Sequence, residues 1–152
     1  MGLELGQPTE RKPPFKYSAL TRVGFSDTDA QGVVYYSRYF PYFDQARVEY
    51  HRHLEMLATA PPGLEFVMRA LSIEYHAPAR FDDLLEVFVR PARIGRTSVQ
   101  FDFAAYLVDD DALMVTAKQT IVLVDAAARR PVPVPDEHRG KLRAFEGDSL
   151  LE

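Results

Sequence analysis

The most informative part of this 152-residue chain is residues 25–57, which read FSDTDAQGVVYYSRYFPYFDQARVEYHRHLEML. A polar turn with two acids and a glycine comes first, and apolar residues then recur at helical spacing. This spacing predicts a helix from about Tyr36 to Leu54 or Leu57, and the cluster Pro61-Pro62-Gly63 is expected to stop it. The apolar stripe is rich in aromatic residues and consists of Tyr36, Tyr39, Phe40, Phe43, Ala46, Arg47, Tyr50, Leu54 and Leu57. A stripe this broad needs a large surface to pack on.

The residues after this helix change to a repeat of two, which predicts β-strands. Val99, Phe101 and Phe103, for example, alternate with polar residues. Strands are predicted near residues 15–25, 66–76, 84–94, 98–108 and 112–124. The acidic triplet at 109–111 and Gly95 are expected to form the turns of two hairpins.

These elements predict an α+β fold in one domain. One long helix followed by antiparallel strands packs best with the helix on one face of a curled sheet. Residues 121–124 read IVLV without alternation, so we expect this strand to be covered on both faces. A short helix is predicted from Asp136 to Phe145. We expect residues 15–145 to form the domain, and residues 1–14 and 146–152 to be flexible, because the first segment is polar and proline-bearing and the second is acidic.

Composition excludes several classes of function. The net charge of −4 argues against nonspecific nucleic-acid binding, although a local basic pocket is compatible with it. The absence of cysteine excludes disulfides and a thiol nucleophile. With no signal peptide and no 18-residue apolar span, we expect a cytoplasmic protein without stable membrane insertion. The four histidines lack zinc-ligand spacing, and the serine-hydrolase elbow, the phosphate-binding loop and the dinucleotide fingerprint are missing, so no metal or cofactor is expected.

The polar turn is the candidate site. Asp29 lies just before the predicted helix start, where the helix dipole is positive and backbone N–H groups have no intrahelical partner. A carboxylate there can attack a carbonyl or activate water, while such an N–H polarises the carbonyl oxygen. Acids also commonly cap turns. We expect Asp27 to order the turn, because two reacting carboxylates so close together would raise the pKa of one of them.

Three segments resemble a known family. They are residues 27–39 (DTDAQGVVYYSRY), 43–50 (FDQARVEY) and 73–83 (IEYHAPARFDD). Together they resemble the hotdog-fold acyl-CoA thioesterases of the 4-hydroxybenzoyl-CoA thioesterase type, which include the short-chain acyl-CoA thioesterases encoded beside the bacterial Tol-Pal system. The resemblance covers roughly residues 17–135. It implies a curved antiparallel sheet wrapped around a long central helix, and hydrolysis of an acyl-CoA to free acid and coenzyme A.

The resemblance also implies roles for single residues. The catalytic carboxylate of the family, a nucleophile or general base, falls on Asp29, and the residue whose N–H binds the thioester carbonyl falls on Tyr36. Many Tol-Pal-associated members have His at the Tyr36 position and Tyr at the Phe25 position, whereas the 4-hydroxybenzoyl-CoA type has an aromatic residue at the helix start. The acyl group therefore stays open between short aliphatic and aryl. The residues expected to line its pocket are Phe25, Gly32, Tyr35 and Phe40.

The family binds the phosphates of coenzyme A at a strand turn. The matching residues here are Arg93, Arg96, Thr97 and Ser98, with Arg130, next to Arg129, after the last strand. Cations and hydroxyls suit phosphate, but the same residues are also ordinary in a solvated turn. In the family the active site lies at a dimer interface. We therefore expect a homodimer or a dimer of dimers, which would also cover the open sheet edge.

Two other functions stay open from the sequence. A hotdog dehydratase or hydratase needs a His that converges with an acid on the acyl chain, and we expect no His beside Asp29 at the helix start. A noncatalytic acyl-CoA-binding module would keep the pocket and lose the acid, which is present here.

Overall fold

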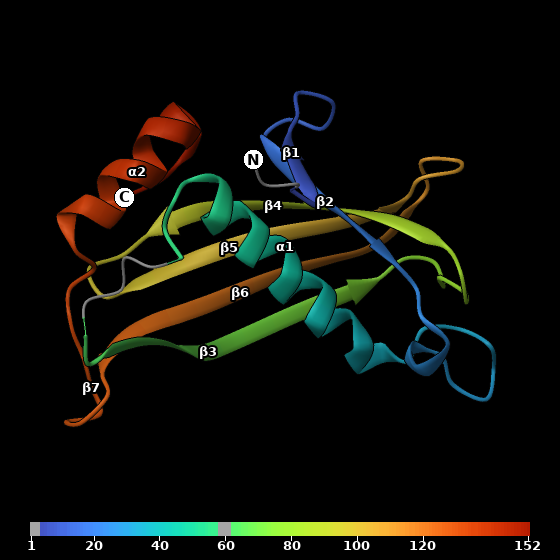
Figure 1. Cartoon of the computed structure of the whole chain (residues 1–152), viewed down its shortest axis with the longest axis horizontal. Helices are drawn as coiled ribbons and strands as arrows, with labels where there is room; N and C mark the ends of the chain where they lie inside the picture. The colour runs from blue at the N-terminus through green and yellow to red at the C-terminus, as the bar shows by residue number, and fades with distance from the viewer. Residues whose placement is uncertain (1–3, 58–61) are drawn as a thin grey trace.

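The computed structural model describes residues 4–57 and 62–152. It contains one seven-stranded antiparallel sheet in the order β1-β2-β4-β5-β6-β3, with β7 paired to β6 (Figure 1). The strands are β1 (Gly6–Pro8), β2 (Tyr17–Arg22), β3 (Leu64–Tyr75), β4 (Leu84–Ile94), β5 (Ser98–Leu107), β6 (Leu113–Asp125) and β7 (Arg130–Pro131). The helices are α1 (Tyr39–His53) and α2 (Asp136–Glu146), with short 3-10 turns η1 (Phe25–Asp27), η2 (Tyr36–Arg38) and η3 (Gly147–Ser149). The predicted α+β arrangement, one long helix on a curved antiparallel sheet, is confirmed.

Helix α1 crosses one face of the sheet (Figure 1). The middle of the predicted stripe is buried there, from Tyr39 to Tyr50, whereas Tyr36 and Leu57 at its two ends are exposed, contrary to the prediction. Phe43 of α1 is fully buried, and its ring lies 4.9 Å from that of Phe103 on β5. The alternation along β5 places Val99 and Phe101 in the same core cluster. Packing against the sheet, more than helix propensity, therefore stabilises this helix.

The α-helix is shorter than the pattern predicted. At its start, residues 36–38 form a 3-10 turn instead of α-helix. At its end, the α-helix stops at His53, so the alternative end at Leu57 is wrong. Glu55 has a left-handed backbone with φ 58°, and the Met56 N–H donates to the His51 carbonyl at 2.8 Å. This is the Schellman arrangement that ends many helices. Pro61 of the predicted stop lies outside the described residues.

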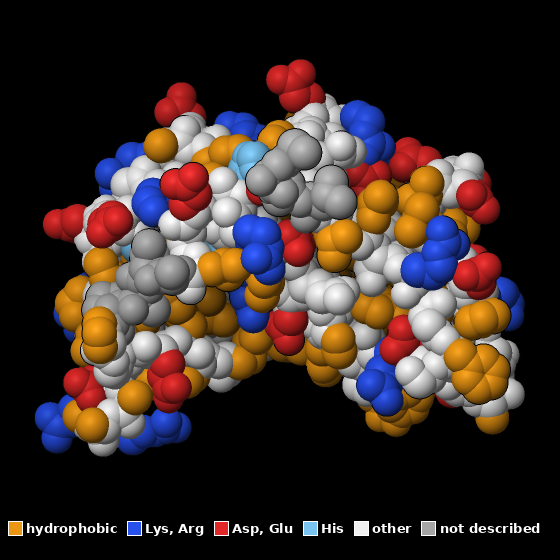
Figure 2. Space-filling view, viewed as in Figure 1, with side chains coloured by type: hydrophobic (Ala, Val, Ile, Leu, Met, Phe, Trp, Pro, Cys, Tyr) orange, Lys and Arg blue, Asp and Glu red, His pale blue; other side chains and the backbone are white. Residues whose placement is uncertain are grey.

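The strand that carries IVLV is buried along residues 121–124, which confirms that both of its faces are covered. Strand β3, in contrast, lies at the edge of the sheet. It pairs with β6 on one side only, and no other described strand pairs with its outer edge. In Figure 2 the margin formed by β3 is hollowed between two projections and carries hydrophobic side chains.

Both terminal segments contact the domain in ways that the sequence did not predict. Residues 6–8 form β1 and pair with β2, and the Phe15 ring packs 6.0 Å from that of Phe88 on the sheet face away from α1. At the other terminus, the Ile94 N–H donates to the Leu151 carbonyl at 2.8 Å, which extends the edge of β4. Helix α2 lies where it was predicted and ends one residue later, at Glu146. Residues 1–3 lie outside the described part.

Candidate active site

The polar turn folds into a loop whose two sides are hydrogen-bonded to each other. The Asp29 N–H donates to the Val33 carbonyl and the Gly32 N–H donates to the Asp29 carbonyl, each at 2.9 Å. Gly32 has φ +78°, a left-handed conformation that side chains disfavour, and a Cβ there would meet nothing within 4 Å. The glycine is therefore needed for backbone conformation, not for space within the monomer.

Asp29 presents one free carboxylate oxygen. Its Oδ1 accepts the Gln31 N–H at 2.8 Å, and its Oδ2 makes no hydrogen bond with any described residue. The side chain is only partly buried. The first contact fixes the direction of the carboxylate, and the second oxygen is available for substrate or water.

Asp27 has different surroundings. Its Oδ2 accepts both the Gly24 N–H at 2.9 Å and the Tyr42 hydroxyl at 2.7 Å, and its carbonyl accepts the Tyr35 N–H at 2.9 Å. A carboxylate with two donors inside the protein is held in place. Asp27 therefore orders the turn, as predicted.

Tyr36 opens η2, and its N–H has no hydrogen-bond acceptor among the described residues. Such N–H groups at a helix start are oriented donors. The Tyr36 carbonyl accepts the Tyr75 hydroxyl at 2.9 Å, which joins the helix start to the end of β3. Its ring lies 4.3 Å from that of Tyr35, and the bond between their hydroxyls, with a smaller contribution from the charge of Asp29, raises the pKa of Tyr35.

A cleft of about 300 Å³ lies beside this helix start. Its lining residues are Val33, Val34, Tyr36, Tyr39, Tyr75, His76, Ala77 and Pro78. The predicted pocket residues are arranged differently: Phe25 is 81% exposed and packs on Phe81, Tyr35 is exposed, and Phe40 packs against the core. Tyr75 and His76 were missed because they lie about 40 residues further along the chain. Their only sequence signal was the third segment of the family resemblance.

His76 corrects one expectation. A histidine does lie beside the helix start, because His76 lines the same cleft as Tyr36. Its Nε2 is 3.1 Å from the Thr116 hydroxyl on β6, so that the ring is engaged with the sheet. The sequence could not show this because α1 and β3 lie between the polar turn and His76 along the chain, and only the fold brings the two together.

The predicted phosphate-binding residues lie at the opposite end of the sheet. Ser98 pairs with Val122 and Arg130 pairs with Asp125, while the carbonyl of Arg96 accepts the Val134 N–H at 2.9 Å. Thr97 lies in the same turn, and Arg93 lies nearby at the edge where Leu151 pairs. Strand β3, twelve residues long, separates this end from Tyr36, a span of roughly 35 Å. One chain therefore does not bring these arginines to Asp29.

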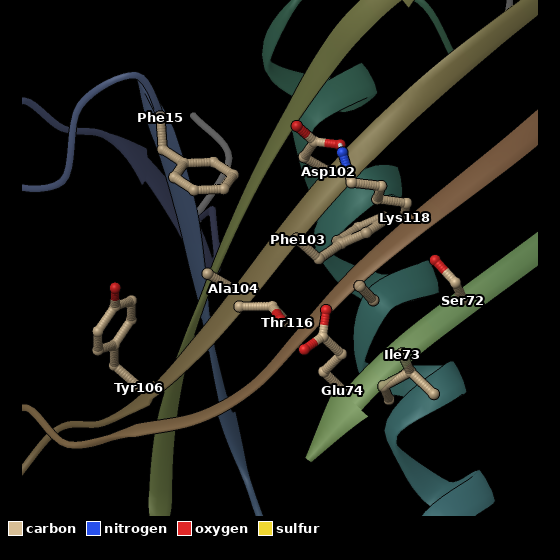
Figure 3. Close-up of a pocket in the computed structure, with 11 residues that line it drawn as sticks. Phe15, Ser72, Ile73, Glu74, Asp102, Phe103, Ala104, Tyr106, Thr116 and Lys118 are labelled. Carbon is tan, nitrogen blue, oxygen red and sulfur yellow. Dashed lines mark ion pairs between the residues drawn. The ribbon is translucent and has the colours of Figure 1, made fainter. Parts of the chain in front are cut away.

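A second pocket lies on the sheet face away from α1 and contains none of the predicted site residues (Figure 3). Two of its charged side chains, Asp102 and Lys118, are paired, whereas Glu74 makes no ion pair with the described residues. Asp102 contacts Arg90 at 3.2 Å and Lys118 at 3.8 Å. The described residues contain no cluster of three or more metal-ligating side chains.

No helix in the described part of the chain is long and apolar enough to cross a membrane. A cytoplasmic location stays a prediction from the sequence.

The sequence is similar to known thioesterases. The family model described as thioesterase-like superfamily matches residues 23–142. The acyl-CoA thioester hydrolase YbgC of Escherichia coli O157:H7 is 34% identical over 116 residues, which cover 75% of this chain and 86% of the relative. The acyl-CoA thioesterase YbgC of Haemophilus influenzae is 33% identical over 124 residues, which cover 80% of this chain and 90% of the relative.

Solved structures agree on the fold. A probable thioesterase from Bartonella henselae is 30% identical with a TM-score of 0.67, and the match covers 78% of this chain and 96% of that one. A 1,4-dihydroxy-2-naphthoyl-CoA thioesterase from Synechocystis has a TM-score of 0.76 at 19% identity, with 82% of this chain and 93% of that one covered. At that identity the second likeness concerns the fold alone.

Proposed function

This chain belongs to the thioesterase-like superfamily and is an acyl-CoA thioester hydrolase, and we propose that Asp29 supplies the carboxylate for hydrolysis. The observation that carries the proposal is the free Oδ2 of Asp29 in a loop that leads directly to the free N–H of Tyr36. Asp27, the other acid of the turn, is occupied by two donors.

The chemistry follows from these two groups. The Tyr36 N–H donates to the thioester carbonyl oxygen, where negative charge develops as the carbon becomes tetrahedral. Asp29 either removes a proton from the attacking water or attacks the carbonyl itself, in which case water then hydrolyses the resulting anhydride. Both routes break the carbon–sulfur bond, and the leaving sulfur takes up a proton to give free coenzyme A.

We further propose that a second copy of the chain completes the site. Pairing of the free β3 edges around a two-fold axis at mid-strand would bring the Tyr75 end of one β3 beside the Leu64 end of the other. The Leu64 end is the one that carries Arg130, because Leu64 and Arg130 both pair with Asp125. The hollowed, hydrophobic margin in Figure 2 supports this interface. Coenzyme A would then lie between Asp29 of one subunit and the arginines of its partner.

The acyl group is expected to enter the cleft beside Tyr36, whose aromatic walls suit a short aliphatic or an aryl group. A hydratase would need a free histidine opposite the acid. His76 does not favour that reaction because its Nε2 is engaged with Thr116.

The test is hydrolysis of aliphatic, aryl and hydroxylated acyl-CoAs, followed by free-thiol detection, for wild type and Asp29→Asn. The asparagine Oδ1 can still accept the Gln31 N–H, so the loop should keep its shape while kcat falls on the order of 10²-fold or more. Asp27→Asn should be milder, and Asp109→Asn in the exposed β5–β6 turn is the matched control. A kcat of Asp29→Asn close to wild type would refute the assignment.

A further inference from the structure

Residues 24–35, which carry Asp29, form a loop before the helix, called the Asp29 loop below. Among the described residues, one side-chain hydrogen bond joins this loop to helix α1, and the Tyr42 hydroxyl makes it. It donates to Asp27 Oδ2 at 2.7 Å, and Tyr42 itself is 5% exposed. Its ring packs edge-on against that of Tyr39 at 5.8 Å, so the hydroxyl is presented in one direction. Burial, together with the bond to Asp27, raises the pKa of Tyr42, which keeps the hydroxyl protonated as a donor.

Asp27 is where the loop and the helix meet. The same carboxylate oxygen accepts the Gly24 N–H, and the Asp27 carbonyl accepts the N–H of Tyr35, the residue before the proposed oxyanion donor. Two residues further along, the Asp29 N–H is bonded to Val33 on the other side of the loop. Movement of Asp27 therefore moves both Asp29 and the residue that precedes Tyr36.

We infer that Tyr42 is a positioning residue, whose bond to Asp27 holds the Asp29 loop in register with the start of the helix. The inference rests on the proposed role of Asp29. A carboxylate that must meet a carbonyl held by a fixed N–H tolerates little displacement, and misplacement by about 1 Å can reduce rates on the order of 10²-fold.

The chain offers a matched control for this inference. Tyr50 lies on the same helix, is fully buried, and donates its hydroxyl to the Glu146 carboxylate at 2.6 Å. This pair joins α1 to α2, away from the Asp29 loop. Tyr50→Phe and Tyr42→Phe therefore remove the same group from the same kind of bond, and they differ in what the bond holds.

The experiment measures kcat, KM and Tm for wild type, Tyr42→Phe, Tyr50→Phe and Asp29→Asn with one acyl-CoA that wild type hydrolyses. We expect Tyr42→Phe to lower kcat at least 10-fold with KM within about 2-fold, because substrate binding does not use the hydroxyl. Tyr50→Phe should lower Tm and leave kcat unchanged. A double-mutant cycle adds Asp27→Ala: once Asp27 is alanine, Tyr42→Phe should cost kcat nothing more.

The outcomes separate the two proposals. If Asp29→Asn is inactive while Tyr42→Phe keeps the kcat of wild type, the positioning role is wrong and the role of Asp29 stands. If Tyr42→Phe lowers only Tm, as Tyr50→Phe should, the bond is purely structural and the inference is also wrong. An active Asp29→Asn variant would overturn the proposed function, and this inference with it.

Discussion

At the scale of single residues, two carboxylates two positions apart have different hydrogen-bond partners, and we propose different roles for them on that ground. Asp27 accepts a backbone N–H and a tyrosine hydroxyl, whereas Asp29 accepts one backbone N–H and keeps an oxygen free. In Tyr36 the side chain has a hydrogen-bond partner and the backbone N–H has none among the described residues. Its side chain contacts Tyr35, and its N–H is the group that can bind a carbonyl.

Replacing Tyr36 by proline tests this N–H directly. Proline is well tolerated at the first residue of a helix, and Tyr35, with φ −62° and ψ 136°, already has the backbone that precedes proline readily. We expect Tyr36→Pro to lower kcat on the order of 10²-fold relative to Tyr36→Ala, which loses the same side chain and keeps the N–H. Steady-state kinetics on both variants gives the comparison. Equal kcat values would mean that the oxyanion is bound elsewhere.

At the scale of elements, the turn between β4 and β5 and the short strand β7 form one basic end of the sheet. The guanidinium groups of Arg96 and Arg130 make no ion pair with the described residues, whereas the neighbouring Arg129 is paired with Glu65 at 3.1 Å. Free cations are the ones available to bind phosphate.

Arg96→Ala and Arg130→Ala should each raise KM for acyl-CoA with little change in kcat, because contacts to the phosphates are equal in the ground and transition states. Arg129→Ala is the matched control and should leave KM nearly unchanged. A truncated pantetheine thioester, which lacks the nucleotide, should be insensitive to all three. Equal losses with the truncated substrate would show that these arginines support structure.

The packing of α2 on α1 predicts an acid-sensitive contact. His51 of α1 lies against Phe101 and His138, and burial, followed by the nearby His138 and Arg47, lowers the pKa of His51 to about 3. Between the unfolded pKa of about 6.5 and this value, the unfolded chain binds a proton that the folded chain does not. Stability from His51 is therefore lost as the pH falls through this window, by up to about 1.4 kcal/mol per pH unit.

His51→Phe keeps an aromatic ring and removes the proton site, so its Tm should fall less steeply than that of wild type between pH 6.5 and 4.5. The pKa of His138 is also lowered by burial and acts in the same direction, so part of the slope should remain. The buried Glu146 has a raised pKa and opposes this trend near its own titration. Thermal melts at a series of pH values measure the difference, and identical slopes for the two proteins would contradict the prediction.

At the scale of the whole molecule, the acid and the basic end are separated by the length of β3, and the outer edge of this strand is open. The antiparallel pairing with a second copy that we propose would account for both observations. That arrangement predicts that turnover requires a dimer, in which each active site contains Asp29 of one chain and the arginines of the other.

Mixing an Asp29→Asn chain with an Arg96→Ala/Arg130→Ala chain tests this prediction. Heterodimers would contain one intact composite site, so mixing should restore activity at substrate concentrations where both homodimers are nearly inactive. Sedimentation establishes that the heterodimer forms. Full activity in a protein that sediments as a monomer would refute the shared site, and a proven heterodimer without recovery would place acid and arginines in the same chain.

The sequence by itself determined the local elements of this protein. Repeats of 3.6 and of two residues placed the long helix and the five main strands, and the charges and glycine between them placed the turns, because these patterns depend on neighbours close in the chain. The polar turn before the helix likewise identified Asp29 as the candidate acid. Strand β1, the tail on β4, the approach of Tyr75 and His76 to Tyr36, and the distance from Arg130 to Asp29 were decided only by the tertiary structure. Each of these depends on pairing between segments far apart in sequence, which no local periodicity encodes.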